Sequence, residues 1–225
     1  DGGAWRDLQS EDIPPTPSEH FNTVTYSGTS ATQSITGVGF KPDWVWIKRT
    51  DGTENHYLQD SSRGSTQQIY SNLTNAQFNE TGAITSFDSD GFTMGSYNGI
   101  NNSGETYVAW CWKGNGGTTS TNNDGDITSD VQVNVTAGFS IVKWTSTSSS
   151  SDTIGHGLGV KPDVVLYKKL SSTGSWFWYT DVIDGSWDEL VLNSNSAKSD
   201  FAGTYATSTT FKSVTSSAGA DWITY

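Results

Sequence analysis

The sequence has few cysteines, few histidines and few basic residues. It contains one Cys, three His and 12 Lys plus Arg against 24 Asp plus Glu, which gives a formal net charge of −12 at pH 7. A single cysteine excludes an intrachain disulfide framework. Nucleic acids and anionic membrane surfaces are bound by clustered Lys and Arg, so the charge argues against both partners. No apolar run approaches the ~18 residues that a membrane-spanning helix needs.

The sequence also lacks the local motifs of common enzyme sites. It has no G-x-S-x-G nucleophile elbow, no phosphate-binding loop and no dinucleotide-binding glycine motif. Its histidines do not show a metal-binding spacing such as H-x-x-x-H. A glycosidase needs two carboxylates about 5–9 Å apart across a cleft, and no Glu stands in an apolar strand where burial would raise its pKa. We therefore predict that the chain is not an enzyme; a glycan-degrading enzyme is the weakest alternative.

One stretch of the sequence is present twice. The pattern G-x-G-x-K-P-D-x-V-x-x-K covers residues 37–48 and again residues 157–168. Residues 104–110 and 219–225 also share a pattern. A repeat of this length indicates a duplicated structural unit. The corresponding positions are Gly37 and Gly157, Gly39 and Gly159, Lys41 and Lys161, Pro42 and Pro162, Asp43 and Asp163, Val45 and Val165, Lys48 and Lys168, Asp60 and Asp181, Gly64 and Gly185, Asn72 and Asn193, and Phe92 and Phe211.

The composition and local patterns predict an all-β fold. Ser, Thr, Asn and Gly are abundant, while ten Trp, nine Tyr and nine Phe supply large apolar side chains. No stretch keeps a 3.6-residue apolar period, whereas short β-branched or aromatic segments recur between turn residues at a spacing of about 8–12 residues. This pattern is typical of two tandem jelly-roll-like β-sandwich modules. Strands are expected at residues 21–26, 43–49, 56–60, 68–72, 84–89, 91–95, 106–113, 131–135, 139–145, 163–169, 175–181, 189–193, 209–214 and 221–225.

The chain divides into four parts by composition. Residues 1–18 contain three closely spaced prolines, which predict an extended N-terminal segment. Residues 19–113 form the first module, and residues 136–225 form the second. Residues 114–135 are rich in Gly, Asn and Thr, which predicts a linker that joins the modules. The strand at the end of the first module continues through Cys111 and Trp112, so we expect the second module to be truncated and the chain to be a piece of a longer protein.

Tryptophans are found in pairs separated by one residue. Side chains two positions apart on a strand point to the same face of the sheet, so each pair predicts a two-ring patch. Such a patch is either a platform on which a sugar ring stacks or part of a hydrophobic core. The pairs are Trp44 with Trp46, Trp110 with Trp112, and Trp176 with Trp178.

The second copy helps to choose between these interpretations. It carries Val164 and Leu166 at the positions of Trp44 and Trp46, which favours a core role for that first pair. The candidates for ligand binding are Trp176, Trp178 and Trp187. Exposure of all three rings on one face would support binding of a carbohydrate.

Two acidic loops are candidates for calcium binding. Asp88 and Asp90 lie two positions apart, as do Asp124 and Asp126, and calcium loops use this spacing. Neither loop continues to the Glu that completes a helix–loop–helix calcium site. The same D-x-D-G pattern is common in hairpin turns, so a turn role and a calcium role both stay open. No other metal or cofactor is predicted.

Four further residues have an expected structural role. Asp60 and Arg63 lie in a segment that also contains His56, and we expect them to form a local ion pair. His156 stands between two glycines, where a turn residue bonded to the backbone is expected. Cys111 lies in an alternating strand and is expected to be a small buried side chain.

Four sequence runs together resemble a repeated β domain of marine bacteriophage proteins. They are FKPDWVWIKR at 40–49, HYLQDSSRG at 56–64, ITSFDSDGFTMGS at 84–96 and GETYVAWCWKG at 104–114. The run GHGLGVKPDVVLYKK at 155–169 resembles the unit that follows it. The resemblance covers nearly all of the chain after residue 20 and implies a concanavalin-like or jelly-roll sandwich. It carries over no catalytic or binding residue.

The resemblance implies a virion structural protein, such as a tail, fibre or capsid-surface component. We expect a non-enzymatic protein that assembles with copies of itself and with other virion proteins, and an extracellular location on the virion. The alternative is a carbohydrate-binding module that recognises host surface glycans through exposed aromatic residues.

Overall fold

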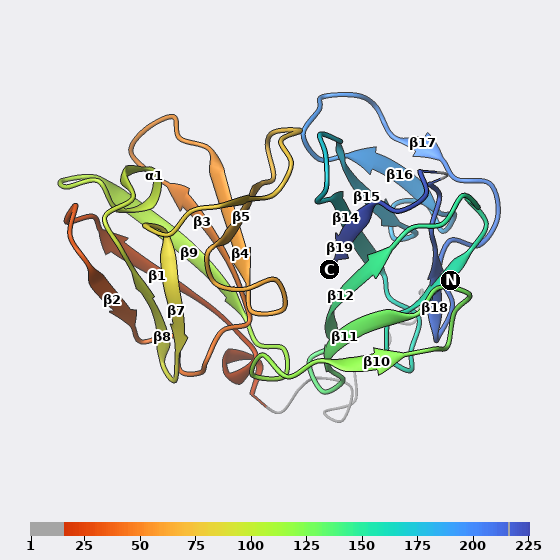
Figure 1. The fold of residues 1–225 in the computed structure, drawn as a ribbon, viewed down its shortest axis with the longest axis horizontal. Coiled ribbons are helices and arrows are strands. Elements are labelled where there is room, and N and C mark those ends of the chain that lie inside the picture. The colour runs from red at the N-terminus through yellow and green to blue at the C-terminus, as the bar shows by residue number, and fades with distance from the viewer. Residues whose placement is uncertain (1–15, 216) are drawn as a thin grey trace, which may run out of the picture.

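The computed structural model describes residues 16–215 and 217–225, and these residues form an all-β structure of antiparallel sheets (Figure 1). The helical segments among them are a 3-10 turn, η1 (Pro17–Glu19), and one short helix, α1 (Asn98–Asn101). Most of the N-terminal segment expected at 1–18 lies outside the described residues. In the described part, none of the helices has the length and hydropathy to cross a membrane.

Residues 21–112 form two antiparallel sheets. Their strands are β1 (Phe21–Ser27), β2 (Gln33–Thr36), β3 (Trp44–Arg49), β4 (His56–Asp60), β5 (Gln67–Tyr70), β6 (Phe78–Asn79), β7 (Ile84–Asp88), β8 (Gly91–Met94) and β9 (Thr106–Trp112). A six-stranded sheet has the order β1-β9-β3-β4-β5-β6, and a three-stranded sheet has the order β2-β8-β7. Alternation along β9 places Tyr107, Ala109 and Cys111 in the hydrophobic core that the two sheets share.

Residues 120–224 form a second pair of sheets. Their strands are β10 (Ser120–Asn122), β11 (Ser129–Asn134), β12 (Phe139–Thr145), β13 (Thr153–Gly155), β14 (Val164–Lys169), β15 (Trp176–Thr180), β16 (Asp188–Val191), β17 (Ser199–Asp200), β18 (Thr210–Lys212) and β19 (Asp221–Thr224). An eight-stranded sheet has the order β10-β11-β12-β19-β14-β15-β16-β17, and β13 pairs with β18. Their core contains stacked aromatic rings, among them Trp144 and Trp222 with ring centroids 5.6 Å apart.

The six-stranded and eight-stranded sheets meet through a third hydrophobic cluster, which we call the junction (Figure 1). Backbone bonds cross it: Gly174 N donates to Thr74 O at 2.8 Å, and Gln77 N donates to Leu170 O at 3.0 Å. Each large sheet therefore has one face in its own core and the other face in the junction. The buried side chains of the junction are Trp44, Leu58 and Ile69 from the first sheet, and Ile141, Leu166, Leu170, Trp176, Ile223 and Tyr225 from the second half of the chain.

Residues that correspond in the sequence repeat make corresponding contacts. Asn72 accepts a hydrogen bond from the backbone N of His56 at the start of β4, and Asn193 accepts one from Trp176 N at the start of β15. Phe92 pairs with Ile35, and Phe211 pairs with Ile154. These positions keep the same structural task in both copies.

The backbone conformation explains why the repeated G-x-G pattern contains glycines. Gly37 and Gly39 have φ values of 86°, and Gly157 and Gly159 have values of 76° and 75°. A side chain is strained in this left-handed region, whereas glycine adopts it freely. The two glycines therefore shape the loop that leads into β3 in one copy and into β14 in the other.

The segment expected to be a linker differs from that prediction. The strand expected at 131–135 is present as β11, and β10, which is not expected from the sequence, pairs with it; both join the eight-stranded sheet. The Gly-rich stretch before them is held by side chains: Gly114 N donates to Asp43 at 2.7 Å, and Gly117 N donates to Gln132 at 2.7 Å. The side chains of Asp43 and Gln132 therefore hold this stretch in one conformation, although its composition alone predicts flexibility.

Candidate functional site

A cavity of about 410 Å³ lined by aromatic rings lies beside the junction, and we call it the aromatic cavity. Trp44 and Trp46 of β3 and Trp112 of β9 line it on one side. Phe139 of β12 and Trp178 of β15 line it on the other. Strand alternation explains the first group, because Trp44, Trp46 and Trp112 all lie on the face of the six-stranded sheet that is opposite its own core.

The rings of the aromatic cavity are stacked on one another. The Trp44 centroid lies 4.2 Å from that of Trp112 and 4.2 Å from that of Tyr225, with the Trp44 and Tyr225 planes only 9° apart. Trp44 is 3% exposed, whereas Trp46, Trp112 and Trp178 are half-buried. The cavity therefore has a fixed floor and partly accessible walls.

The indole N–H groups around the cavity have different partners. Trp46 Nε1 donates to His56 Nδ1 at 2.9 Å, and burial, followed by the charge of Lys48, lowers the pKa of His56. The neutral imidazole that results can accept this bond. Within the described residues, Trp44 Nε1 and Trp178 Nε1 are buried and have no hydrogen-bond partner. An unpaired buried donor is costly, and a bound acceptor would satisfy it.

The three predicted ligand-binding residues do not share a face. Trp176 is fully buried in the junction, where its Nε1 donates to Tyr70 O at 2.6 Å. Trp187 is 7% exposed and packs in the other core against Tyr205, with ring centroids 5.6 Å apart. Only Trp178 lines the aromatic cavity, so a ligand role for it stays a prediction.

The core role favoured for Trp44 is partly changed by the structure. Trp44 is buried, but between the two large sheets rather than inside the core that β3 shares with the three-stranded sheet. Its partners Phe139 and Tyr225 come from the other half of the chain. Pairwise spacing in the sequence identifies the shared face of Trp44 and Trp46 but gives no signal for these distant partners.

The four calcium candidates hold local turns in place. Asp90 accepts bonds from Gly37 N at 3.1 Å and Gly39 N at 2.6 Å, and these bonds lower its pKa. Asp88 accepts bonds from the hydroxyls of Ser86 at 2.8 Å and Thr93 at 2.7 Å. Such contacts supply the turn role that the D-x-D-G pattern left open.

The second acidic loop has similar contacts. Asp126 accepts bonds from the Thr153 hydroxyl at 2.8 Å and from Thr153 N at 3.0 Å, which lower its pKa. Asp124 accepts one from Asn122 Nδ2 at 3.0 Å. Calcium at either acidic loop stays a prediction.

A different acidic cluster has ligand atoms close enough to hold a metal. Among the described residues it consists of Asp184, Asp188 and Asp200. The ammonium of Lys198 lies 2.8, 2.6 and 2.9 Å from these three carboxylates. This ammonium already supplies positive charge to the cluster, so the cluster is a charge network built from the chain itself.

The Asp60–Arg63 ion pair is present and is almost completely buried. The two side chains are 0% and 1% exposed. Tyr225 donates its hydroxyl to Asp60 at 2.5 Å, and Arg63 also bonds Gln77 at 3.1 Å. The sequence predicts the local pair, but the long-range partner Tyr225 leaves no local signal.

The predictions for His156 and Cys111 are confirmed. His156 is 2% exposed, and its Nδ1 accepts a bond from Leu158 N at 3.1 Å. Burial lowers the pKa of His156. Cys111 is fully buried, which raises the pKa of its thiol to about 12. The Cys111 thiol is therefore neither accessible nor ionised at neutral pH, as a reactive thiol would be.

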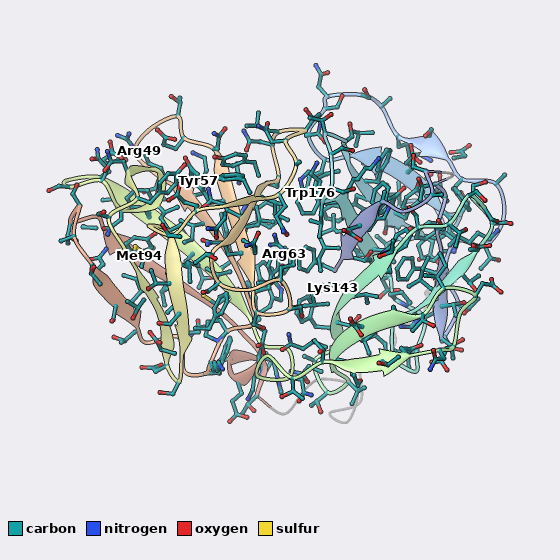
Figure 2. The ribbon with its side chains drawn as sticks, viewed as in Figure 1. Arg49, Tyr57, Arg63, Met94, Lys143 and Trp176 are labelled. Atoms are coloured by element: carbon teal, nitrogen blue, oxygen red, sulfur yellow. The ribbon has the colours of Figure 1, made fainter. Side chains whose placement is uncertain are left out.

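A second, polar cleft of about 560 Å³ lies at the other side of the junction. Arg63, Lys143 and Asp221 are among the residues that line it. Figure 2 shows Arg63 and Lys143 in the space between the two large sheets, with Trp176 above them. Asp221 accepts a bond from the Thr145 hydroxyl at 2.8 Å. The aromatic cavity is the stronger candidate because its buried N–H donors have no partner.

Comparison with known proteins identifies one family. The model of a family described as "Domain of unknown function (DUF7483)" matches residues 16–225. No curated protein and no solved structure matches the chain.

Proposed function

Because the chain belongs to the DUF7483 family, whose description names no activity, we propose from its own geometry that it is a non-enzymatic structural protein of a bacteriophage virion. It would serve as a tail, fibre or capsid-surface component. Its tandem jelly-roll-like β-sandwich modules would assemble with copies of the same chain and with other virion proteins. The resemblance of residues 40–49, 56–64, 84–96 and 104–114 to phage β domains motivates the virion location.

The observation that carries this proposal is the buried junction. Domains in one chain usually move relative to each other unless their interface is large and hydrophobic. Here aromatic stacking of Trp44 on Tyr225 is combined with the buried Asp60–Arg63 pair. Such an interface favours one relative orientation of the two halves. A fixed orientation suits a building block of a symmetric particle.

The environment of the buried lysine whose pKa is lowered supports a structural role. Lys168 is fully buried, and burial lowers its pKa to about 8. A lowered lysine pKa is also found in catalytic sites. However, its ammonium donates to the backbone O of Thr74 at 3.0 Å and to Gly174 O, so it joins a loop of each half. These two hydrogen bonds support a role for Lys168 in holding the two halves together rather than as a nucleophile.

Imaging of the native particle tests the proposal. Electron cryomicroscopy of a virion that carries this protein should show its density at regular, symmetry-related positions on the tail, fibre or capsid surface. The number of copies per particle should be a multiple of the local symmetry. A purified particle that contains no copy of the chain would refute the virion assignment.

The aromatic cavity supports a second candidate, recognition of host surface glycans. Half-buried rings of Trp46, Trp112 and Trp178 offer faces for a pyranose. A glycan array probed with the purified chain tests this role. Binding that is lost in Trp178→Ala and kept in Trp110→Ala supports it, because Trp110 is half-buried but outside the cavity lining. A glycan array on which the purified chain gives no binding signal would refute the glycan-recognition role.

A further inference from the structure

The junction face of the eight-stranded sheet changes from apolar to polar along two neighbouring strands. On β12, Ile141 lies in the junction, whereas Lys143, two positions later on the same face, lines the polar cleft. On β19, Ile223 lies in the junction, and Asp221 on the same face lines the polar cleft. The polar cleft therefore continues the junction at the opposite end of β19 from Tyr225.

Both halves of the chain contribute to the polar cleft. The first half supplies Arg63 and Gln77, and the second half supplies the other lining residues, among them Lys143 and Asp221. Figure 2 shows Arg63 on the side of the first half and Lys143 on the side of the second. The cleft volume of about 560 Å³ lies in the range of sites that bind small molecules.

Lys143 is a half-buried cation without a partner. Within the described residues its ammonium takes part in no ion pair and donates no hydrogen bond. Asp130 lies opposite it in the register of β11 and β12, but the two side chains are not paired. A charged group that is partly removed from water without a partner is unfavourable. An anionic group of a ligand in the cleft would therefore stabilise the Lys143 ammonium.

The guanidinium in the cleft lining is already neutralised. Arg63 is paired with the buried Asp60 carboxylate, and its Nη1 donates to Gln77 Oε1 at 3.1 Å. This bond fixes the Gln77 amide and leaves the Gln77 Nε2 group as a donor. Lys143 is therefore the cation of the cleft that can bind an anion, and Gln77 offers a neutral donor beside it.

Two carboxylates line the same cleft. Asp130 and Asp221 are exposed, and Asp221 accepts a bond from the Thr145 hydroxyl at 2.8 Å. An ionised carboxylate accepts hydrogen bonds from hydroxyl groups but repels other anions. A compact anion with several charges, such as phosphate, is therefore disfavoured beside Asp130 and Asp221. A ligand that combines one negative charge with hydroxyl donors fits these neighbours better.

The charged groups of the cleft stand where the first copy of the repeat has neutral residues. In the strand register, Lys143 occupies the position of Thr25, and Asp221 occupies the position of Thr106. The first copy forms the same strand pairing with these threonines, so the pairing does not require the charges. Lys143 and Asp221 therefore belong to the surface chemistry that distinguishes the second copy from the first.

Among the described residues, no exposed aromatic ring lines the polar cleft. The two tryptophans in its lining, Trp144 and Trp222, are 4% and 5% exposed and stack on each other in the core on the other face of the sheet. The cleft therefore offers polar groups rather than ring faces. It shares no lining residue with the aromatic cavity.

We propose that the polar cleft binds a sugar that carries a carboxylate, such as a uronic acid or a sialic acid. The carboxylate of the sugar pairs with the Lys143 ammonium and accepts a bond from Gln77 Nε2. Asp130 and Asp221 accept bonds from the sugar hydroxyls. One cation beside two acceptor carboxylates matches one acid group on a hydroxylated ring. The site goes beyond the functions proposed above, neither of which places a ligand in this cleft.

Titration of the ¹⁵N-labelled whole chain with free sugars tests the site. The probes are D-glucuronic acid and N-acetylneuraminic acid, and D-glucose is the neutral counterpart of the first. We expect saturable NMR shifts of the amides of residues 128–130, 143–145 and 221–222 with at least one of the two acids. The probe that binds identifies the kind of acidic sugar. Glucose should bind about tenfold or more weakly, because it lacks the charge-assisted bond to Lys143.

Substitution of the free cation gives a second readout. Lys143→Met removes the ammonium and keeps an apolar side chain of similar length, so it should weaken binding of the acidic sugar by about tenfold or more. Lys143→Arg should keep most of the binding, because it restores the charge. Lys212→Met is the matched control, since Lys212 is a half-buried lysine of β18 outside the cleft lining. The comparison with glucose uses the wild type and does not depend on how any variant folds.

Three results would overturn the proposal: no saturable shift with either acid, equal binding of glucose, or unchanged binding in Lys143→Met. Binding that is lost in Trp178→Ala and kept in Lys143→Met would also overturn it, because the sugar would then lie in the aromatic cavity. That outcome would support the glycan-recognition candidate instead. Failure here would leave the virion assignment intact, because particle imaging tests that assignment without reference to the polar cleft.

Discussion

Tyr225 donates its hydroxyl to the Asp60 carboxylate at 2.5 Å, although 165 positions of sequence separate them. The same carboxylate pairs with Arg63, and all three side chains are buried between the two large sheets. Two repeat-related halves are thus joined by a charge pair that only the first half supplies and by a hydroxyl that only the second half supplies.

Tyr225→Phe should lower the free energy of unfolding by about 1.5–3 kcal/mol, because it removes a hydrogen bond to a buried charged group and keeps the stacked ring. Urea unfolding at pH 7 measures the change. Tyr26→Phe is the control, since the Tyr26 hydroxyl donates to the neutral carbonyl of Ile100 at 2.8 Å. Its cost should be about 0.5–1.5 kcal/mol. A smaller cost for Tyr225→Phe than for Tyr26→Phe would contradict the role given to the buried charge.

Arg63→Met should destabilise the chain by about 3–5 kcal/mol, because it leaves the buried Asp60 carboxylate without its cation. Arg49→Met offers a matched comparison. Arg49 pairs with Asp51 and Glu105 at partly exposed positions, where ion pairs contribute about 0–1 kcal/mol. Both variants can be compared by chemical unfolding at pH 7. Equal losses would show that the Asp60–Arg63 pair is not the dominant polar contact of the junction.

Lys168→Met should change how stability depends on pH. Burial lowers the pKa of Lys168 in the folded chain to about 8, from about 10.5 for an exposed lysine. Between these values the unfolded chain binds more protons than the folded chain, so this lysine makes stability rise with pH. The wild type should therefore gain more stability than the variant between pH 8 and pH 10. If the free energy of unfolding depended on pH in the same way in the wild type and in the variant between pH 8 and pH 10, the lowered pKa would be refuted.

Asn72→Ala and Asn193→Ala should have similar effects, because each asparagine accepts a bond from the first backbone N of a strand at the corresponding place in the repeat. A hydrogen bond of this kind contributes about 0.5–1.5 kcal/mol. Thermal unfolding of the single and double variants provides the measurement. The double variant measures how strongly the two sites are coupled, because Trp176, the partner of Asn193, also donates its indole N–H to Tyr70 O, two residues before Asn72. A loss confined to one copy would mean that the repeat does not keep this function.

The Cys111 thiol should not react with Ellman's reagent in the folded chain at pH 8. It is fully buried and its pKa is raised to about 12, so both access and thiolate are lacking. One thiol per chain should react after unfolding in guanidinium chloride. Rapid reaction of the native protein would show that β9 opens readily.

Much of the fold is predictable because the longer strands carry a clear pattern. β1 alternates exposed with half-buried positions, and β9 alternates buried with more exposed ones. These alternations, and the apolar runs of β12 and β14, follow residue types that identify the strands from the sequence. The D-x-D-G pattern, which is common in hairpin turns, here does join two paired strands, since β7 and β8 pair with Asp88 opposite Gly91. Local patterns are sufficient where one strand contains its own signal.

The short polar strands could not be predicted in this way. β2, β10 and β13 have four, three and three residues, mostly Ser, Thr, Asn, Gln or Gly. They become strands because a neighbour offers backbone bonds, as β11 does for β10. Their conformation is set by tertiary pairing, which residue type does not reveal.

In the candidate site too, local features are predictable from the sequence and long-range contacts are not. The sequence predicts that Trp44 and Trp46 share a face, and it predicts the Asp60–Arg63 pair. It does not predict that Phe139 and Tyr225 meet Trp44, because that contact depends on how two separate sheets pack. For the same reason Trp176, Trp178 and Trp187 look alike in the sequence, but Trp176 and Trp178 lie on the junction side whereas Trp187 lies in the other core.

The distance in sequence between Asp60 and Tyr225 has a consequence during synthesis. At roughly 5–20 residues per second, a ribosome needs on the order of ten seconds to extend the chain from one to the other. During that interval the first half can fold its own core while Trp44, Leu58 and the Asp60–Arg63 pair still face water. A nascent chain of this protein therefore presents an apolar surface that a chaperone, or the same surface of a neighbouring nascent chain, can reach before the second half covers it.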